Sequence, residues 1–113
     1  MKYLCLIYDE EKQFETMPKP ELEGIMKEYR SFSEEIRKSG HYLAGHQLAP
    51  TNAAKTVRIR HGKVSQTDGP FAETKEQLGG FYLIEAKDIE EATQIASRIP
   101  SARMGSIEVR PIV

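Results

Sequence analysis

Two segments of the sequence are apolar at consecutive positions, and they constrain the fold more than any other feature. Residues 3–8 and residues 81–84 would carry apolar side chains on both faces of an extended strand. A strand of this kind is covered on both faces in the folded protein. Neither segment approaches the roughly 20 residues that a membrane-spanning helix needs. We therefore predict two buried central strands.

A helix is predicted after each of these strands. Between residues 20 and 38 the apolar residues recur at helical spacing, at Leu22, Ile25, Met26, Tyr29, Phe32 and Ile36. The second helix is expected to begin after Asp88, which would act as N-cap with Glu91 three residues later, and to run through Ile99 to Pro100. The polar segment 9–19 between the first strand and the first helix is expected to be a loop.

Two further segments alternate between apolar and polar residues. Residues 42–48 would form a strand that places Tyr42 and His46 on one face, and residues 55–68 would form a hairpin that turns at His61-Gly62. The turn sets a register in which Ile59 lies opposite Val64, Val57 opposite Gln66, and Lys55 opposite Asp68. In this register Asp68 shares a face with the apolar residues, so we expect its carboxylate to point inward.

The predicted order is strand, helix, strand, hairpin, strand, helix, strand, with a final strand at residues 105–111. This order indicates an α+β fold, a ferredoxin-like sandwich with a β-hairpin insertion, in a single domain over residues 1–113. Two helices can cover only one face of the sheet. The other apolar face is expected to meet a second copy of the chain, so that the homodimer closes a dimeric α+β barrel.

Composition excludes several classes of protein. The chain has 113 residues, of which 39% are hydrophobic and 29% charged, and its net charge is -1. This balance gives no overall attraction to nucleic acid or to anionic lipid. Arg58, Arg60 and Lys63 form a small basic patch without interleaved aromatic residues, so nucleic-acid binding is not expected. The first eight residues are too short for a secretory signal peptide, and we expect a cytoplasmic protein with no membrane partner.

Residues 67–81 concentrate residues with special backbone preferences. The segment combines an Asp-Gly-Pro turn at 68–70, a charged stretch and the pair Gly79-Gly80 directly before an apolar strand. A glycine pair at the start of a strand is typical of a β-bulge or of a tight entry into the strand. No glycine-rich turn leads into a helix, so the segment is not a nucleotide-binding loop.

Residues 68–76, together with residues 78–84, resemble the signature of the YCII-related proteins of the DGPF type. The segments at residues 1–4, 56–58 and 106–111 are also similar to that family. The resemblance implies a dimeric α+β barrel and, from relatives in the wider family, a catalytic pair of a histidine and an aspartate. It also implies a regulatory role, because some related domains accompany alternative sigma factors.

The candidate catalytic residues are His46 and Asp68. Asp68 matches the aspartate of the family motif, and His46 is chosen because it lies on a predicted inward face. A carboxylate beside an imidazole fixes its tautomer and raises its basicity, which suits general acid–base chemistry. Two structural alternatives stay open for Asp68, a hydrogen bond within its own turn and a salt bridge to Lys55. The alternative for His46 is a packed interior or interface histidine.

The candidate substrate-binding residues are Tyr8, Lys55, Phe71 and Tyr82. The tyrosines would line an aromatic pocket, although core packing explains them equally well, and Tyr8 or Lys55 would polarise the substrate. His41, His46 and His61 are scattered, and Cys5 is the single cysteine, so we expect no metal site, no disulfide and no cofactor. Cys5 lies among apolar residues and is expected to be a buried hydrophobic side chain.

These features predict a small homodimer that binds an organic molecule in its barrel, such as an aromatic or keto-acid-like metabolite. If the protein is an enzyme, cofactor-free lyase or isomerase chemistry by proton transfer fits best, with a metal-free monooxygenase as an analogy from the fold alone. The alternative is a non-catalytic regulatory module that binds a transcription component such as a sigma factor.

Overall fold

The computed structural model describes residues 1–113 and contains one four-stranded and one two-stranded sheet. The strands of the larger sheet stand in the order β2-β5-β1-β6, and each is antiparallel to its neighbours. The elements in chain order are β1 (Lys2–Asp9), α1 (Glu11–Glu15), α2 (Lys19–Lys38), β2 (Tyr42–Gln47), η1 (Thr51–Ala53), β3 (Lys55–Arg60), β4 (Lys63–Asp68), β5 (Gln77–Glu85), α3 (Ile89–Ala96), η2 (Pro100–Arg103) and β6 (Ser106–Pro111). The predicted α+β class is confirmed, and the larger sheet of the single chain is open.

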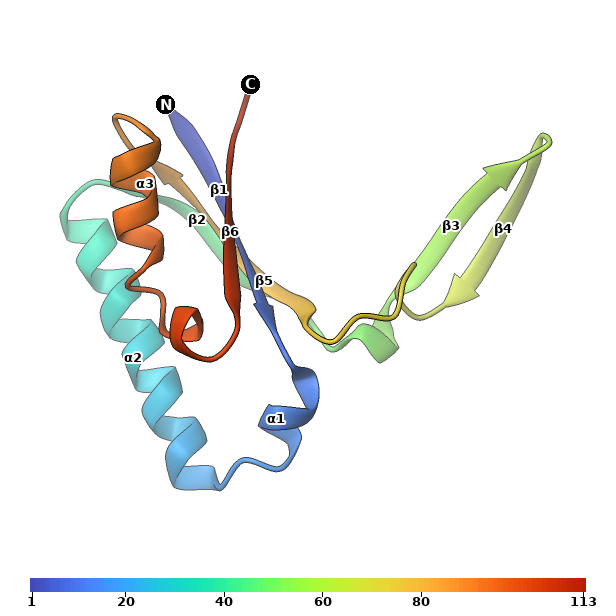
Figure 1. The fold of residues 1–113 in the computed structure, drawn as a ribbon, viewed down its shortest axis with the longest axis horizontal. Helices are drawn as coiled ribbons and strands as arrows, with labels where there is room; N and C mark the ends of the chain where they lie inside the picture. The colour runs from blue at the N-terminus through green and yellow to red at the C-terminus, as the bar shows by residue number, and fades with distance from the viewer.

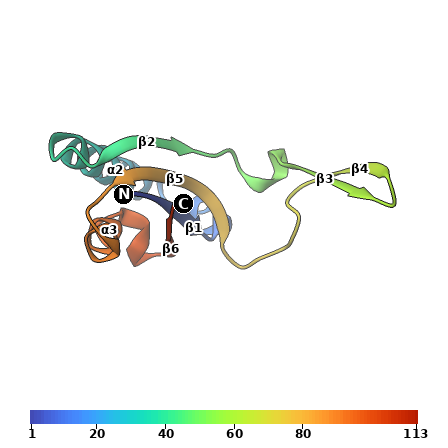
Figure 2. The ribbon, with the colours of Figure 1, turned by 90° about the horizontal axis from the view of Figure 1, so that it is seen from above.

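The long helix α2 connects β1 to β2, and α3 with η2 connects β5 to β6 (Figure 1). In the sheet, β5 lies between β1 and β2, and β1 lies between β5 and β6. Two views show both helices at one end of the molecule and the β3-β4 hairpin pointing away from them at the other end (Figures 1 and 2). None of the helices is long and apolar enough to cross a membrane.

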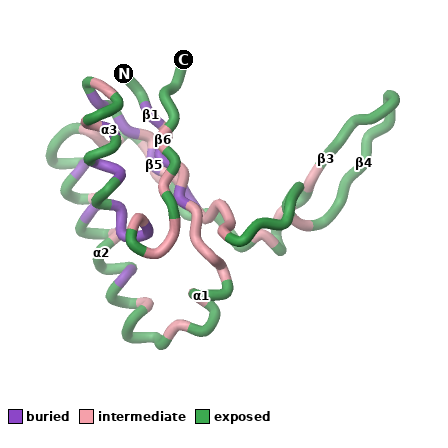
Figure 3. Tube along the Cα trace, in the orientation of Figure 1, coloured by how far each residue is buried: buried purple, intermediate pink, exposed green.

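The core lies between the helices and one face of the larger sheet. Alternate residues of β1 supply Tyr3, Cys5 and Ile7, and β5 supplies Tyr82 and Ile84; these residues form one cluster with apolar side chains of both helices, Phe32, Ile36, Ala92 and Ile95. Figure 3 shows the buried residues gathered on these elements and none on the hairpin. Cys5 is fully buried, and burial raises the pKa of its thiol to about 11, which confirms its predicted packing role.

Helix α3 begins as predicted and ends earlier. The Asp88 carboxylate accepts a hydrogen bond from the backbone N–H of Glu91 at 2.9 Å, as an N-cap should. The prediction that this helix continues through Ile99 is wrong. Helix α3 ends at Ala96, and a separate short 3-10 helix, η2, begins at Pro100. The prediction of a loop over residues 9–19 is also wrong. β1 extends to Asp9, and the short helix α1 follows it.

Two β-bulges change which residues share a face. In β2 the register shifts between Tyr42, which pairs with Ile84, and Ala44, which pairs with Leu83. The extra residue, Leu43, reverses the alternation, so the prediction that Tyr42 and His46 share a face is wrong. In β5 the extra residue is Gly79, which confirms the predicted bulge at the glycine pair.

The hairpin has the predicted register. Ile59 pairs with Val64, Val57 with Gln66, and Lys55 with Asp68. The turn residues His61 and Gly62 have φ angles of 52° and 73°, which is the left-handed conformation that a tight two-residue hairpin turn requires. The hairpin forms its own two-stranded sheet and does not join the larger one.

Candidate functional site

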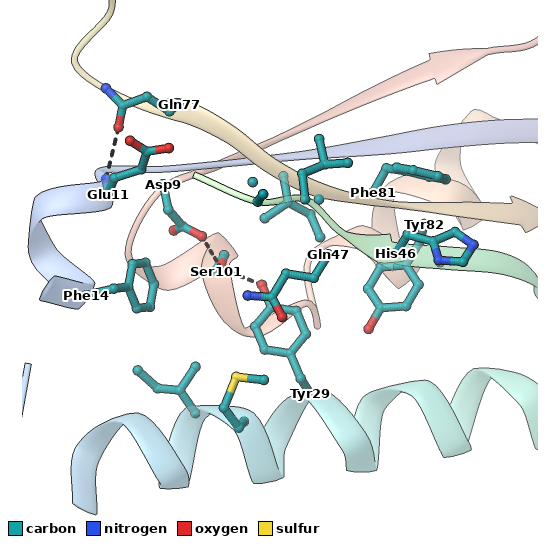
Figure 4. A pocket seen from close by; sticks show the side chains of 18 of the residues that line it. Asp9, Glu11, Phe14, Tyr29, His46, Gln47, Gln77, Phe81, Tyr82 and Ser101 are labelled. Atoms are coloured by element: carbon teal, nitrogen blue, oxygen red, sulfur yellow. Dashed lines mark hydrogen bonds between the residues drawn. The ribbon is translucent and has the colours of Figure 1, made fainter. Parts of the chain in front are cut away.

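A cleft of about 710 Å³ lies between α2 and the end of the sheet near α1 (Figure 4). Its walls include the apolar side chains of Ile7, Phe14, Leu22, Ile25 and Met26. Polar groups enter the same space from four elements, at Asp9, Tyr29, Gln47 and Ser101. Apolar walls with a few convergent polar groups are typical of a small-molecule site.

Asp9 is the last residue of β1 and occupies the face of the strand that packs against the helices. Tyr3, Cys5, Ile7 and Asp9 alternate on this face, and the first three belong to the core. The Oδ2 atom of Asp9 accepts a hydrogen bond from Ser101 Oγ at 2.7 Å. Its Oδ1 atom is buried and has no hydrogen-bond partner. An unpaired carboxylate oxygen in the interior is costly, so it marks a candidate functional group.

Ser101 connects Asp9 to Tyr29. The Tyr29 hydroxyl lies 2.5 Å from Ser101 Oγ, and Ser101 is fully buried. A serine hydroxyl has one proton, which Ser101 donates to Asp9, so Tyr29 must be the donor in its contact with Ser101. The three side chains form a relay in which hydrogen bonds run from Tyr29 through Ser101 to Asp9 (Figure 4).

Burial shifts the acidity of both ends of this relay. Desolvation raises the pKa of Asp9, the hydrogen bond from Ser101 opposes this rise, and the charge of Glu76 adds to it. Desolvation likewise raises the pKa of Tyr29 to about 12, against the opposing effect of its hydrogen bond with Ser101. Tyr29 therefore stays protonated at neutral pH, while Asp9 holds a proton more readily than an exposed aspartate does.

A second hydroxyl pair lies further along α2. The hydroxyls of Ser33 and Tyr82 are 2.7 Å apart, and desolvation raises the pKa of Tyr82. Because Ser33 is one turn of α2 after Tyr29, the helix presents two hydroxyl contacts to the sheet from the same side.

The segments at the α1 side of the cleft are tied together by Glu11. Its carboxylate accepts hydrogen bonds from the backbone N–H and the hydroxyl of Thr51 at 2.7 and 2.8 Å. Its own backbone N–H donates to the Gln77 side-chain oxygen at 2.9 Å. These contacts fix α1, η1 and the start of β5 relative to one another, which holds this side of the cleft in place.

A family model of the YCII-related domain matches residues 1–113. The chain belongs to the YCII-related domain family. It is also 39% identical over 114 residues to an uncharacterised protein of Rhizobium meliloti (strain 1021), a match that covers 99% of this chain and 92% of the relative. The predicted family is confirmed, and the YCII-related domain spans the whole chain.

Two of the six site residues predicted from the sequence line the cleft of this YCII-related chain, namely His46 and Tyr82. The His46 ring lies 5.8 Å from the Phe81 ring, and no hydrogen bond joins His46 to Asp68. Tyr82 has its ring in the core and its hydroxyl on Ser33.

The other four predicted residues, Tyr8, Lys55, Asp68 and Phe71, lie outside the cleft. The Asp68 side chain is 85% exposed and pairs with Lys55 Nζ at 2.7 Å, which is the salt bridge that the sequence left open as an alternative. Within one chain, the YCII-related fold does not assemble His46 and Asp68 into a pair.

Sequence reasoning missed Asp9, Ser101 and the role of Tyr29. Asp9 had a visible signal, because it continues the alternation of Tyr3, Cys5 and Ile7 as a charged residue on a buried face. Ser101 had none, since its partners lie 72 and 92 positions away in the sequence. No group of three or more His, Cys, Asp or Glu residues is placed to hold a metal ion.

Proposed function

We propose that the chain is a cytoplasmic homodimer that binds a small organic molecule in the cleft and transfers a proton on it without a cofactor, as a lyase or isomerase does. The observation that carries this proposal is the relay from Tyr29 through Ser101 to Asp9, which ends at a carboxylate oxygen without a partner. A half-buried, hydrogen-bonded acid in a cleft is the arrangement expected of a general acid–base group.

The relay allows a proton to move between the ligand and Asp9 without direct contact between them. When Asp9 is ionised, the Tyr29 oxygen can accept a proton from the ligand as its own proton passes to Ser101 and the serine proton passes to Asp9. In the reverse direction, protonated Asp9 donates to Ser101, Ser101 to Tyr29, and Tyr29 to the ligand. Each transfer moves one proton along an existing hydrogen bond, so the net change is one proton between ligand and Asp9.

The cleft favours a neutral molecule with an apolar body. Phe14, Leu22 and Met26 offer apolar surface. The charged side chains of the cleft are Asp9, Glu11 and Glu15 against Arg37, so acidic groups outnumber basic ones. Because like charges repel, an aromatic alcohol or ketone suits the cleft better than a keto acid.

The fold supports the homodimer and barrel parts of the proposal. The strand order β2-β5-β1-β6, with a helical crossover between β1 and β2 and another between β5 and β6, is what a ferredoxin-like sandwich requires. Leu4, Leu6 and Leu83 alternate with the core residues, so they lie on the face of the sheet away from the helices. A second copy would cover this face and close a dimeric barrel.

The DGPF-type resemblance keeps the regulatory alternative as a second proposal, a module that binds a transcription component such as a sigma factor. This alternative predicts that such a component copurifies with the chain and stays bound to the Asp9→Asn variant. The enzyme proposal makes no such demand, so the two proposals are separable by experiment.

The test uses acetophenone and benzyl alcohol as neutral aromatic probes. Addition of either probe should shift the backbone NMR signals of Tyr29, Ser33 and Gln47. In deuterated water, the protein should accelerate exchange of the methyl protons of acetophenone, because these protons are acidic next to the carbonyl. Asp9→Asn and Tyr29→Phe should reduce this exchange to the buffer rate.

Glu90→Gln, on the exposed face of α3, is the matched control and should exchange acetophenone protons as fast as the natural chain. Probe shifts confined to residues outside the cleft would overturn the binding site. Exchange that survives in Asp9→Asn but is lost in Asp68→Asn would overturn the relay and restore the pair predicted from the sequence.

A further inference from the structure

The exposed apolar side chains of this protein are concentrated on the β3-β4 hairpin, which we call the arm (residues 55–68). Apart from the chain ends, the four most exposed large apolar residues are Val57 at 59%, Ile59 at 62%, Val64 at 65% and Phe71 at 79%. The first three belong to the arm, and Phe71 follows it on the way back to the sheet. Single exposed apolar residues are ordinary, but a cluster on one element marks an interaction surface.

The arm has one apolar and one basic face. Ile59 pairs directly with Val64, and Val57 lies two residues before Ile59 on the same strand, so the three form a continuous stripe. We call these three residues the arm stripe. The opposite face carries Arg58 and the cross-strand pair Arg60 and Lys63. In an amphipathic hairpin of this kind, the apolar face is normally packed against another surface and the basic face is exposed to solvent.

Nothing in the same chain covers the arm stripe. The hydrogen bonds at the base of the arm join its own two ends: Gly69 N–H donates to the Ala54 carbonyl at 2.7 Å, and the Thr56 hydroxyl donates to the Gly69 carbonyl at 2.9 Å. The Arg58 guanidinium donates to the Phe71 carbonyl, just beyond the arm, at 3.4 Å. No arm residue belongs to the core cluster, and apart from Thr56 near its base the arm is exposed along its length (Figure 3). Since a lone two-stranded hairpin is marginally stable in water, an arm of this length needs support from another surface.

A second unpartnered apolar surface lies on the larger sheet. The core residues Cys5 and Tyr82 pair across β1 and β5 on the helix side, and Leu6 pairs with Phe81 on the other face. Leu4 and Leu83 pair on that same open face, and the four side chains are only half buried. The arm points away from the helices in both views (Figures 1 and 2).

We propose that the arm stripe packs against a second copy of this chain, in a homodimer in which each arm embraces the other subunit. A second copy brings an open sheet face and an arm stripe at the same time, so one two-fold contact covers all of these surfaces. A strand of six residues is about 20 Å long, which lets each arm extend beyond its own sheet along the partner. The inference rests on the homodimer of the proposed function and adds the arm as its clamp.

The test compares the natural chain with two double variants over a range of protein concentrations. Ile59→Thr with Val64→Thr makes two of the three stripe residues polar but keeps β-branched residues at this cross-strand pair. Arg60→Thr with Lys63→Thr makes the same change at the adjacent pair on the opposite face. Sedimentation equilibrium should give a dimer dissociation constant at least about tenfold higher for the stripe variant, and an unchanged one for the control.

Hydrogen exchange of the arm amides provides the second measurement. Amides of residues 57–66 should be protected in the concentrated natural chain and should lose protection on dilution to monomer or in the stripe variant. We call the larger sheet with its helices the body of the protein. Because the arm contributes nothing to the core, the body of each variant should stay folded, and hydrogen exchange of the core amides checks this directly.

Three outcomes would overturn the inference. If the natural chain is a dimer and the stripe variant dimerises equally well, the arm is not the clamp and the homodimer stands. Arm amides that exchange freely in the concentrated dimer lead to the same conclusion. A natural chain that is monomeric at every concentration overturns both the arm and the homodimer, and assigns the stripe to a different protein.

Discussion

The body and the arm of this protein are built from similar strands that have opposite surroundings. In β1 every second residue is buried against the helices, and its neighbours remain half exposed on the open face. In β3 the same alternation leaves Val57 and Ile59 among the most exposed apolar residues of the chain. The comparison shows that alternation defines which residues share a face, whereas burial depends on whether another element reaches that face.

The two regions also use their aspartates differently. Asp9 ends a core strand, faces the cleft and has one buried oxygen without a partner. Asp68 ends an arm strand and forms an exposed salt bridge with Lys55. Charged groups acquire special properties where water is excluded, so the body rather than the arm carries the candidate chemistry.

The largest expected contrast is between buried and exposed branched residues. Ile84→Ala should lower the free energy of unfolding by about 2–5 kcal/mol, because Ile84 is fully buried and its removal leaves a cavity. Val64→Ala should change it by less than about 0.5 kcal/mol, since Val64 is exposed in the single chain. Urea unfolding of dilute protein measures both, and equal losses would remove the distinction between body and arm.

Gly105→Ala should lower the free energy of unfolding by about 1–3 kcal/mol. A Cβ atom at this position would overlap the carbonyl oxygen of Tyr8 and would come within 2.6 Å of Asp9 Oδ1. For comparison, Lys63→Ala in the arm changes an exposed side chain and should have little effect. A Gly105→Ala variant as stable as the natural chain would show that the end of β1 is not tightly packed.

Asp88→Ala should lower the free energy of unfolding by about 1 kcal/mol, because it removes the side chain that caps α3. Asp88→Asn is the control, since an amide oxygen can accept the same hydrogen bond from the N–H of Glu91. In thermal unfolding, the melting temperature of Asp88→Asn should be close to that of the natural chain, and that of Asp88→Ala should be lower. Equal melting temperatures for all three would mean that the cap does not stabilise the body.

Asp9→Asn should make the protein more stable at neutral pH than the natural chain. Burial raises the pKa of Asp9, so the folded state binds this proton more tightly than the unfolded state does. The stabilisation linked to that proton is complete below the ordinary carboxyl pKa and is lost as pH rises through the raised pKa. Unfolding followed by urea across this pH range should show the two proteins converging at low pH, and parallel curves would contradict the prediction.

The smallest effect is expected at the base of the arm. Asp68→Asn should change stability by less than about 0.5 kcal/mol, because the side chains of Lys55 and Asp68 are 66% and 85% exposed and water screens their attraction. Lys55→Met tests the same pair from the other side. If either variant lowered the free energy of unfolding of dilute protein by more than about 1 kcal/mol, the ion pair would have to be less exposed than it is in the structure of the single chain.

Local features were predictable to the residue where neighbours in the sequence determine them. The His61-Gly62 turn fixed the hairpin register, and Asp88 with Glu91 marked the start of α3, since both depend on contacts within a few positions. The bulge at Leu43 was not predictable. It depends on how β2 meets β5, some 40 positions away, and it reversed the face that had been assigned to His46.

By itself, the sequence determined the family, the α+β class, the six strands, the helices α2 and α3, and the two faces of the arm. Periodicity and turn chemistry encode these features locally. Only the tertiary structure decided which polar groups meet. It joined Tyr29, Ser101 and Asp9 across separations of 72 and 92 residues, and it left Asp68 on an exposed arm. Contacts between distant residues depend on how sheet and helices pack together, and no local pattern in the chain specifies that packing.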